Sequence, residues 1–223
     1  MPAFPQAVVF DLDGTLVDSA ADIAEALNAA VAPLAGGTFG VADVKQMIGG
    51  GSLVLIRKAL DSRGIALNDA DWSATLDRFM RAYAEVSALG RGLYPGAHEL
   101  LSDLHNAGCR VALCTNKPEM VTHIAVKALG LTDRMHAVIG AREDRPKKPD
   151  PAMLHVALDA IGASTQGAVM IGDSAADIGC AKAAGVRSVV LRHGYSKSPV
   201  ETLGADVIAD DLVALRQILA RWR

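Results

Sequence analysis

The 223-residue sequence predicts an α/β fold with a parallel sheet and an inserted α-helical cap domain. From residue 92 onward, short apolar runs alternate with helical patterns, which is typical of a parallel sheet with helices on both faces. Residues 18–90 show helical periodicity only. We therefore expect a core formed by residues 1–17 and 91–223, interrupted after its first strand by a cap formed by residues 18–90.

The expected core begins with an apolar run at residues 7–10, which indicates a buried strand. Further strands are expected at residues 110–115, 136–139, 168–171, 188–191 and 206–208. Helices are expected around them at residues 95–107, 118–129, 151–161, 175–184 and 210–222. A glycine follows four of these helical patterns, as is usual at the C-terminus of a helix.

In the insert, apolar side chains recur at helical spacing. The first pattern covers residues 23–34, with Ser19 and Asp22 as candidates for its N-terminal cap. Other helical patterns cover residues 41–48, 52–63 and 71–89. The last one carries an apolar stripe that we interpret as the core of the cap, formed by Trp72, Leu76, Phe79, Met80 and Tyr83. An insert that leaves the ligand-binding edge of a sheet would lie over the site as a lid.

Composition and charge argue against some classes of protein. The net charge is -3 and no basic block occurs, which argues against nucleic-acid binding. No stretch reaches the roughly 18 apolar residues that a membrane span requires, so we expect a cytoplasmic protein with no membrane partner. The cysteines Cys109, Cys114 and Cys180 are isolated, which fits a reduced and buried state. We expect a monomer or a small homo-oligomer.

Four polar groups each follow a predicted strand. They are Asp11, Asp13 and Gly14; Thr115, Asn116 and Lys117; Lys147 and Lys148; and Asp173, Ser174 and Asp177. The carboxyl ends of parallel strands meet at one edge of a sheet, where ligands bind. We therefore expect these groups to converge on one site.

The residue types fit phosphoryl transfer through a covalent aspartate. Asp11, at the end of a rigid strand, is the expected nucleophile, and Asp13 in the following turn is the expected acid and base. Carboxylates this close repel one another and also repel a dianionic phosphate. A Mg²⁺ ion is therefore expected on the Asp11 side chain, the Asp13 carbonyl and Asp173.

The phosphate itself needs positive charge and hydrogen-bond donors. Lys148 is expected to supply a fixed positive charge, and the Thr115 hydroxyl with nearby main-chain N–H groups is expected to bind the remaining oxygens. Asn116 is assigned to the same phosphate-binding group. Lys147 is expected to face solvent, because the Pro-x-Pro sequence after Lys148 favours Lys148 as the ordered member of the pair.

At these residues the sequence resembles the phosphatase branch of the haloacid dehalogenase superfamily. The matching motifs are Asp11-Leu-Asp13-Gly14-Thr15, Thr115-Asn116, Lys148-Pro-x-Pro151 and Gly172-Asp173-x-x-x-Asp177. The resemblance covers essentially the whole chain and implies a Rossmann-like core with a helical cap after the first motif. It also implies that Asp177 is a supporting acid that orients the lysine or the metal-bound waters, together with Gly14 and Ser174 as supporting residues.

Within that superfamily the sequence is most similar to bacterial phosphoglycolate phosphatases. The supporting stretches are Tyr94-Pro95-Gly96, residues 115–118, residues 147–149 and Gly194-Tyr195. The cap segment at residues 48–51 is similar to a Gly-Asn-Gly element of that subfamily, with Gly50 where asparagine is usual. Lys45 and Arg57 flank this segment and are candidates to bind a substrate carboxylate.

The expected function is Mg²⁺-dependent hydrolysis of a small phosphorylated metabolite, with 2-phosphoglycolate favoured. Three alternatives stay open. The first is a broader sugar-phosphate phosphatase, and the second is a phosphomutase of the β-phosphoglucomutase kind, which would keep the aspartyl-phosphate for a second sugar phosphate. The third is a non-catalytic module that binds phosphorylated metabolites. A dehalogenase fits less well, because its substrate needs neither the proton donor Asp13 nor a metal.

Overall fold

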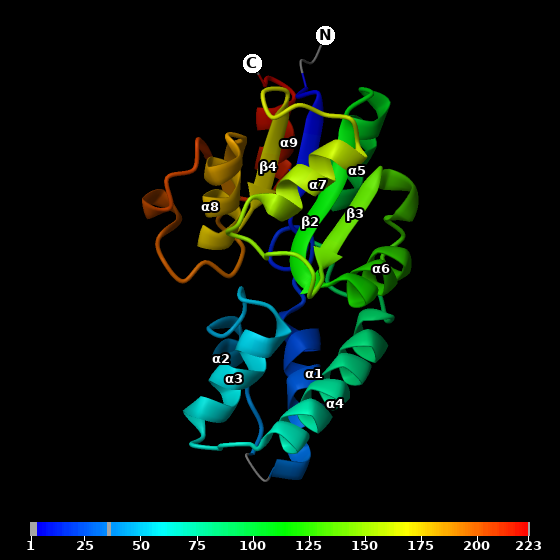
Figure 1. Ribbon diagram of the computed structural model, residues 1–223. Helices are drawn as coiled ribbons and strands as arrows, with labels where there is room; N and C mark the ends of the chain where they lie inside the picture. The colour runs from blue at the N-terminus through cyan, green and yellow to red at the C-terminus, as the bar shows by residue number, and fades with distance from the viewer. Residues whose placement is uncertain (1–3, 35–36, 223) are drawn as a thin grey trace.

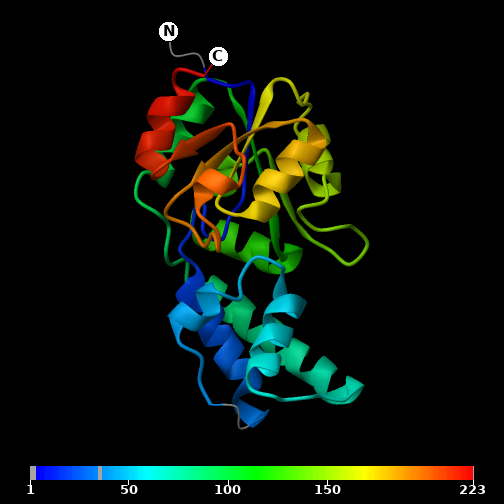
Figure 2. The ribbon, with the colours of Figure 1, turned by 90° about the vertical axis from the view of Figure 1, so that its left-hand side faces the viewer.

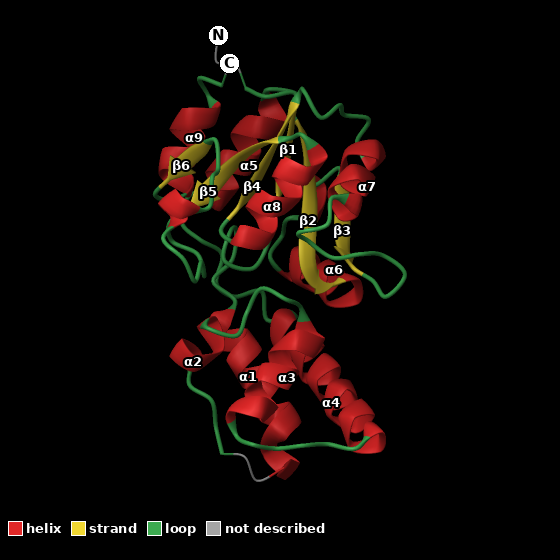
Figure 3. Ribbon diagram, turned by 60° about the vertical axis from the view of Figure 1, so that its left-hand side comes forward, coloured by secondary structure: helices red, strands yellow, loops and turns green. Residues whose placement is uncertain are grey.

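The computed structural model describes residues 4–34 and 37–222. Figures 1 and 2 show two bodies, a layered α/β core and a helical cap, joined by two chain segments. The predicted fold class is confirmed, because a parallel sheet forms the core and helices alone form the insert, as Figure 3 shows. No helix in the described ranges is long and apolar enough to cross a bilayer.

In the described part of the chain, the core sheet has six parallel strands in the order β3-β2-β1-β4-β5-β6. Their bounds are β1 Ala7–Phe10, β2 Arg110–Pro118, β3 Ala137–Ala141, β4 Ala168–Gly172, β5 Arg187–Leu191 and β6 Val207–Ala209. The strand order reverses direction at β1, which pairs with β2 on one side and β4 on the other. In such sheets the ligand crevice lies at this point, outside the carboxyl ends of the strands.

Helices cover both faces of the sheet, as the alternation of side chains along β1 requires. Val8 and Phe10 belong to the apolar cluster that includes helices α5 and α9, whereas Ala7 and Val9 belong to the cluster that includes α7 and α8. The helices of the core are α5 Ala97–Asn106, α6 Glu119–Ala128, α7 Ala152–Ala160, α8 Ala175–Ala184 and α9 Leu212–Leu219. All of β1 is buried, so the end of this strand is a rigid platform.

The cap has an apolar cluster of its own. Its helices are α1 Ala20–Val31, α2 Val41–Lys45, α3 Ser52–Ser62 and α4 Asp69–Ser87. Leu27, Ile56 and Phe79 are fully buried in this cluster, which also takes in Val121 of α6 from the core. The division of the chain at residues 17/18 and 90/91 stays a prediction.

The two segments that connect cap and core lie side by side. The main-chain N–H of Asp18 donates to the carbonyl of Gly92 over 2.7 Å, and Val17 forms an antiparallel bridge with Leu93. Gly92 has φ 80°, and a Cβ there would lie 2.5 Å from the Asp18 carbonyl oxygen. Glycine at this position therefore lets the outgoing and returning chain approach closely.

Some element ends differ from the predictions. Strand β2 continues to Pro118 instead of ending at residue 115, and its pairing with β3 shifts register between Cys114 and Pro118. Ser19 makes no capping hydrogen bond with its side chain. Instead, the Ala20 N–H donates to the Tyr195 hydroxyl over 3.1 Å and to Asp18 Oδ1 over 3.4 Å. A distant residue and a neighbouring one thus accept this bond in place of Ser19.

Candidate active site

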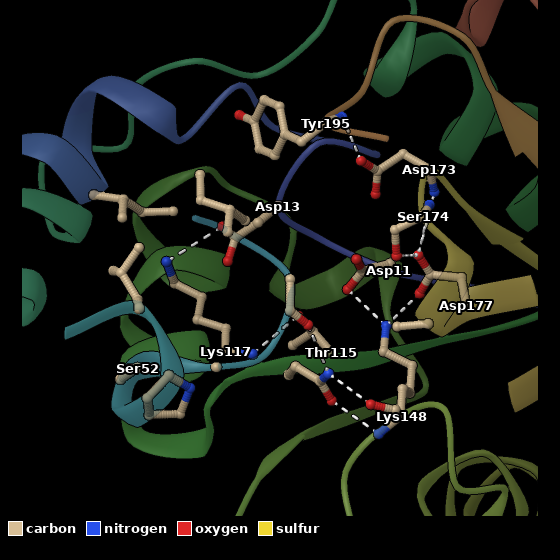
Figure 4. A pocket seen from close by; sticks show the side chains of 18 of the residues that line it. Asp11, Asp13, Ser52, Thr115, Lys117, Lys148, Asp173, Ser174, Asp177 and Tyr195 are labelled. Carbon is tan, nitrogen blue, oxygen red and sulfur yellow. Dashed lines mark hydrogen bonds and ion pairs between the residues drawn. The ribbon is translucent and has the colours of Figure 1, made fainter. Parts of the chain in front are cut away.

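Four segments of the core bring polar side chains to the edge where the strands end (Figure 4). Asp11 directly follows β1, and Asp173 directly follows β4, so these two carboxylates flank the reversal point of the sheet. Thr115 lies within β2 and Lys148 in the loop after β3. All four side chains line one cavity.

The ammonium of Lys148 contacts three oxygen atoms in this cavity. It lies 2.9 Å from Asp11 Oδ1 as an ion pair, and it donates to Asp177 Oδ1 over 2.6 Å and to the Cys114 carbonyl over 2.7 Å. Two of its three N–H donors are thus in hydrogen bonds. Burial alone would lower the pKa of Lys148, but the two carboxylates raise it above its ordinary value. The ammonium is therefore a fixed positive charge.

The Asn116 side chain holds the main chain of Lys148. Its amide nitrogen donates to the Lys148 carbonyl over 3.0 Å and to the Gly49 carbonyl over 3.2 Å, and its oxygen accepts from the Lys148 N–H over 3.0 Å. Both amide protons are thus committed. The side chain thus positions Lys148 and contacts the cap, and the assignment of Asn116 to the phosphate-binding group stays a prediction.

Asp177 lies in the first turn of α8 and caps that helix. Its Oδ2 accepts from the Ser174 hydroxyl over 2.6 Å and from the main-chain N–H groups of Ser174 and Asp173. Its Oδ1 faces Lys148. The carboxylate therefore joins the start of α8 to the buried lysine, which is the supporting position that the family resemblance implied.

Asp11, Asp173 and Asp177 each place a carboxylate oxygen within 4.8 Å of the others, and all three are buried. Burial raises the pKa of Asp11 to about 6, although Lys148 opposes the shift. Burial and the neighbouring carboxylates also raise the pKa of Asp173 above its ordinary value. An all-oxygen set of crowded, buried carboxylates suits a hard divalent cation, which would offset this repulsion.

Neighbouring chain segments fix Asp173. The Tyr195 N–H donates to its Oδ2 over 2.6 Å, and the Thr15 hydroxyl donates to its Oδ1 over 3.3 Å. Gly14 has φ 85°, and a Cβ there would lie 2.5 Å from Asp173 Oδ2. Glycine in the first motif therefore allows the turn after β1 to pass directly beside this carboxylate.

The Asp13 carboxylate points away from the cluster of acids, toward the cap. Its Oδ1 lies 3.4 Å from the ammonium of Lys117, and its Oδ2 accepts from the Tyr83 hydroxyl of α4 over 3.2 Å. Burial and Asp13 raise the pKa of Tyr83, so the phenol stays protonated and donates this bond. Burial lowers the pKa of Lys117, although Asp13 opposes the shift. If Asp13 binds the metal ion, it would therefore do so through its main-chain carbonyl oxygen, as expected from the sequence.

Comparison with known proteins decides the family. Residues 5–185 match the model of the haloacid dehalogenase-like hydrolases. The chain belongs to this family. It is 42% identical over 215 residues to the phosphoglycolate phosphatase of Rhodospirillum rubrum, covering 95% of this chain and 89% of the relative. It is 38% identical to that of Caulobacter vibrioides, with 90% and 85% covered.

A solved structure supports the same relationship. A predicted phosphoglycolate phosphatase from Haemophilus somnus 129pt superposes with a TM-score of 0.90 at 29% identity, covering 98% of this chain and 99% of the other. The resemblance inferred from the motifs is thereby confirmed for this haloacid dehalogenase-like hydrolase.

The cavity of this hydrolase lies between core and cap and offers about 70 Å³ to water-sized molecules, which is room for only a handful of them. The core contributes charged side chains. The cap contributes mainly apolar ones, which are Ile23, Ile48, Leu55 and Phe79. Ser52 at the start of α3 and Tyr83 of α4 are the polar side chains on that side.

The three cap residues predicted to contact substrate are not among the residues that line this cavity. Lys45 pairs with Asp18 over 3.4 Å. Arg57 lies 5.3 Å from the ring centre of Trp72; it follows Leu55 by two residues, which places it about 200° around the helix. At Gly50 a Cβ would meet the Val54 side chain at 2.8 Å, so a side chain there would press against α3. The structure shows no contact of these side chains with the cavity, and their role in substrate binding stays a prediction.

Four further residues lie in places that the sequence did not fully predict. Phe79 and Tyr83 are interpreted from the sequence as cap core, and both do pack there, but they also line the cavity. Lys117 is expected in the converging group without an assigned role, and it lines the cavity beside Asp13. Lys147 is half-buried, not fully in solvent, with its ammonium beside Gly51 of the cap.

Proposed function

We propose that this hydrolase is a Mg²⁺-dependent phosphatase that converts 2-phosphoglycolate to glycolate and phosphate. The observation that carries the proposal is the Asp11 carboxylate. It is held 2.9 Å from Lys148 and beside Asp173, at the floor of a small cavity. The named activity of the relatives at 38–42% identity supports the choice of substrate.

In the proposed reaction, Asp11 attacks phosphorus and the bond to the leaving oxygen breaks. The phosphoryl group then resides on the Asp11 carboxylate as an aspartyl-phosphate. Asp13 gives a proton to the leaving alkoxide and later takes one from the water that cleaves the intermediate. Lys148, the Thr115 hydroxyl and main-chain N–H groups at the strand ends stabilise the negative oxygens of the transferring group.

The metal site is assigned to the Asp11 and Asp173 carboxylates and the Asp13 carbonyl, with Asp177 holding Lys148 beside them. The choice of Mg²⁺ rests on the oxygen-only donor set and on the phosphate chemistry. A Mg²⁺ ion bound there would supply positive charge that offsets the dianionic phosphate. Without it, the crowded carboxylates would repel the substrate.

The character of the cavity favours a small acid over a sugar phosphate. A sugar needs several hydrogen-bond partners for its hydroxyl groups, because unpaired polar groups in a buried site are costly. The cap offers mainly aliphatic and aromatic side chains and little volume. In a two-carbon phosphomonoester, only one short carbon chain has to pack against that surface.

A panel of phosphomonoesters tests the proposal. Phosphate release is expected to require Mg²⁺, to stop with EDTA, and to be fastest with 2-phosphoglycolate. Faster release from sugar phosphates would favour the broader phosphatase. Formation of glucose 6-phosphate from glucose 1-phosphate and a bisphosphate primer would favour the mutase. Absence of metal-dependent release from every substrate would favour a binding module.

A further inference from the structure

The cavity has a second lysine whose role the proposed reaction leaves open. In the described part of the chain, Lys117 and Lys148 are the lysines that line the cavity, and no arginine lines it. Lys148 pairs with Asp11 and Asp177, and the proposed reaction assigns it to the transferring phosphoryl group. Of these two lysines, Lys117 therefore remains to receive a second anionic group.

The ammonium of Lys117 has few hydrogen-bond partners for a buried charge. Its side chain is 2% exposed, and Asp13 Oδ1 lies 3.4 Å away. This is longer than the roughly 2.7–2.9 Å of a good charge-assisted hydrogen bond. On another side it lies 3.7 Å from the ring centre of Tyr83. An ammonium carries three N–H donors, so capacity remains for a further acceptor.

The position of Lys117 relative to the phosphate site suits a short substrate. Lys117 follows Thr115 by two residues in β2, and its N–H donates to the Thr115 hydroxyl over 3.3 Å. Thr115 and Lys117 both line the cavity. A phosphate bound at Thr115 and Lys148 would thus have Lys117 within reach of a group only one or two carbons away.

The surroundings of Lys117 favour an anion at that end. The cap lines the cavity with Ile23, Leu55 and Phe79, which provide no competing hydrogen bond. A charge pair in such a water-poor place is much stronger than one in solvent. A neutral hydroxyl would gain far less from the same position.

We propose that Lys117 binds the carboxylate of the substrate and thereby selects phosphorylated small acids over neutral phosphomonoesters. The Tyr83 ring packs against the Lys117 ammonium, and the Asp13 carboxylate forms an ion pair with it. The inference rests on the proposed phosphatase function and adds the residue that determines the substrate class. It assigns to the core strand β2 a role that the sequence suggested for Lys45 or Arg57 of the cap.

The test compares two substrates of equal length, 2-phosphoglycolate and ethyl phosphate, which lacks the carboxylate. The readout is the ratio of their kcat/KM values. Lys117→Met is expected to lower this ratio about 100-fold or more, because a site built around a charged group rejects the analogue without it. Lys117→Arg, which keeps the charge, is expected to recover part of the ratio. Lys45→Met is the matched control and is expected to leave it unchanged.

An equal loss on both substrates in Lys117→Met would overturn the inference and make Lys117 a residue that only positions Asp13. A wild-type protein without preference for the carboxylate would also overturn it, while the phosphatase function stands. If the wild type releases phosphate from neither ester, the function itself fails.

A measurement on the wild type avoids any dependence on the folding of variants. Glycolate is expected to compete with the substrate, whereas ethanol at the same concentration is expected to have no effect. Equal inhibition by the two compounds would contradict a carboxylate site at Lys117.

Discussion

The two sides of the cavity are built differently. On the core side, charged side chains follow buried strands and are tied to one another by hydrogen bonds, as Lys148 is to Asp11 and Asp177. On the cap side, helices contribute apolar surfaces such as Leu55 and Phe79. The difference indicates that bond breaking belongs to the core, while the cap excludes water and limits size. Substitutions on the two sides should therefore alter different kinetic constants.

Removing the nucleophile should give the largest effect. Asp11→Asn is expected to reduce kcat at least about 10⁴-fold, as loss of a covalent nucleophile does in other enzymes. The thermal midpoint should change little, because the substitution removes a buried charge but keeps the shape. Asp144→Asn, at a carboxylate whose side chain is 64% exposed, is the control. A turnover near normal in Asp11→Asn would remove Asp11 from its assigned role.

Removing the metal should have the next largest effect. EDTA is expected to lower phosphate release about 10³-fold or more, and added Mg²⁺ should restore it. Mg²⁺ should also raise the thermal midpoint, because the carboxylates of Asp11 and Asp173 and the Asp13 carbonyl form its proposed site only in the folded protein. This rise should disappear in Asp173→Asn. Equal midpoints with and without Mg²⁺ would contradict a metal site among these carboxylates.

Enlarging the cap side should change selectivity more than the rate of chemistry. Leu55→Ala removes a side chain that is 4% exposed and should cost about 2–5 kcal/mol of stability. The ratio of kcat/KM between a bulkier phosphomonoester and 2-phosphoglycolate should rise about 10-fold. A comparable fall in kcat for every substrate, without a change in that ratio, would place Leu55 in the chemistry instead.

The smallest effect is expected at Arg57. Arg57→Ala should leave kcat and KM for 2-phosphoglycolate within about two-fold, because surface changes away from a site are usually near neutral. Loss of its contact with the Trp72 ring should cost about 0.5–1 kcal/mol. A large increase in KM would restore Arg57 as a substrate-binding residue.

The sequence predicted the core side of the site far better than the cap side. Asp11, Lys148 and Asp173 could be brought together because parallel strands end at one edge, so position along the chain implies position in space. Whether Leu55 or Arg57 faces the cavity depends on how the cap helices dock, and spacing alone does not determine that. The side-chain partners of Asn116, Lys148 and Gly49, could not be predicted because they belong to distant segments.

The stereochemical course at phosphorus tests the central claim most directly. The substrate would be 2-phosphoglycolate made chiral at phosphorus with oxygen isotopes. Attack by Asp11 followed by attack of water gives two in-line displacements, so the account predicts overall retention of configuration. Inversion would show that water attacks the substrate directly and would contradict the assignment of Asp11 as the nucleophile.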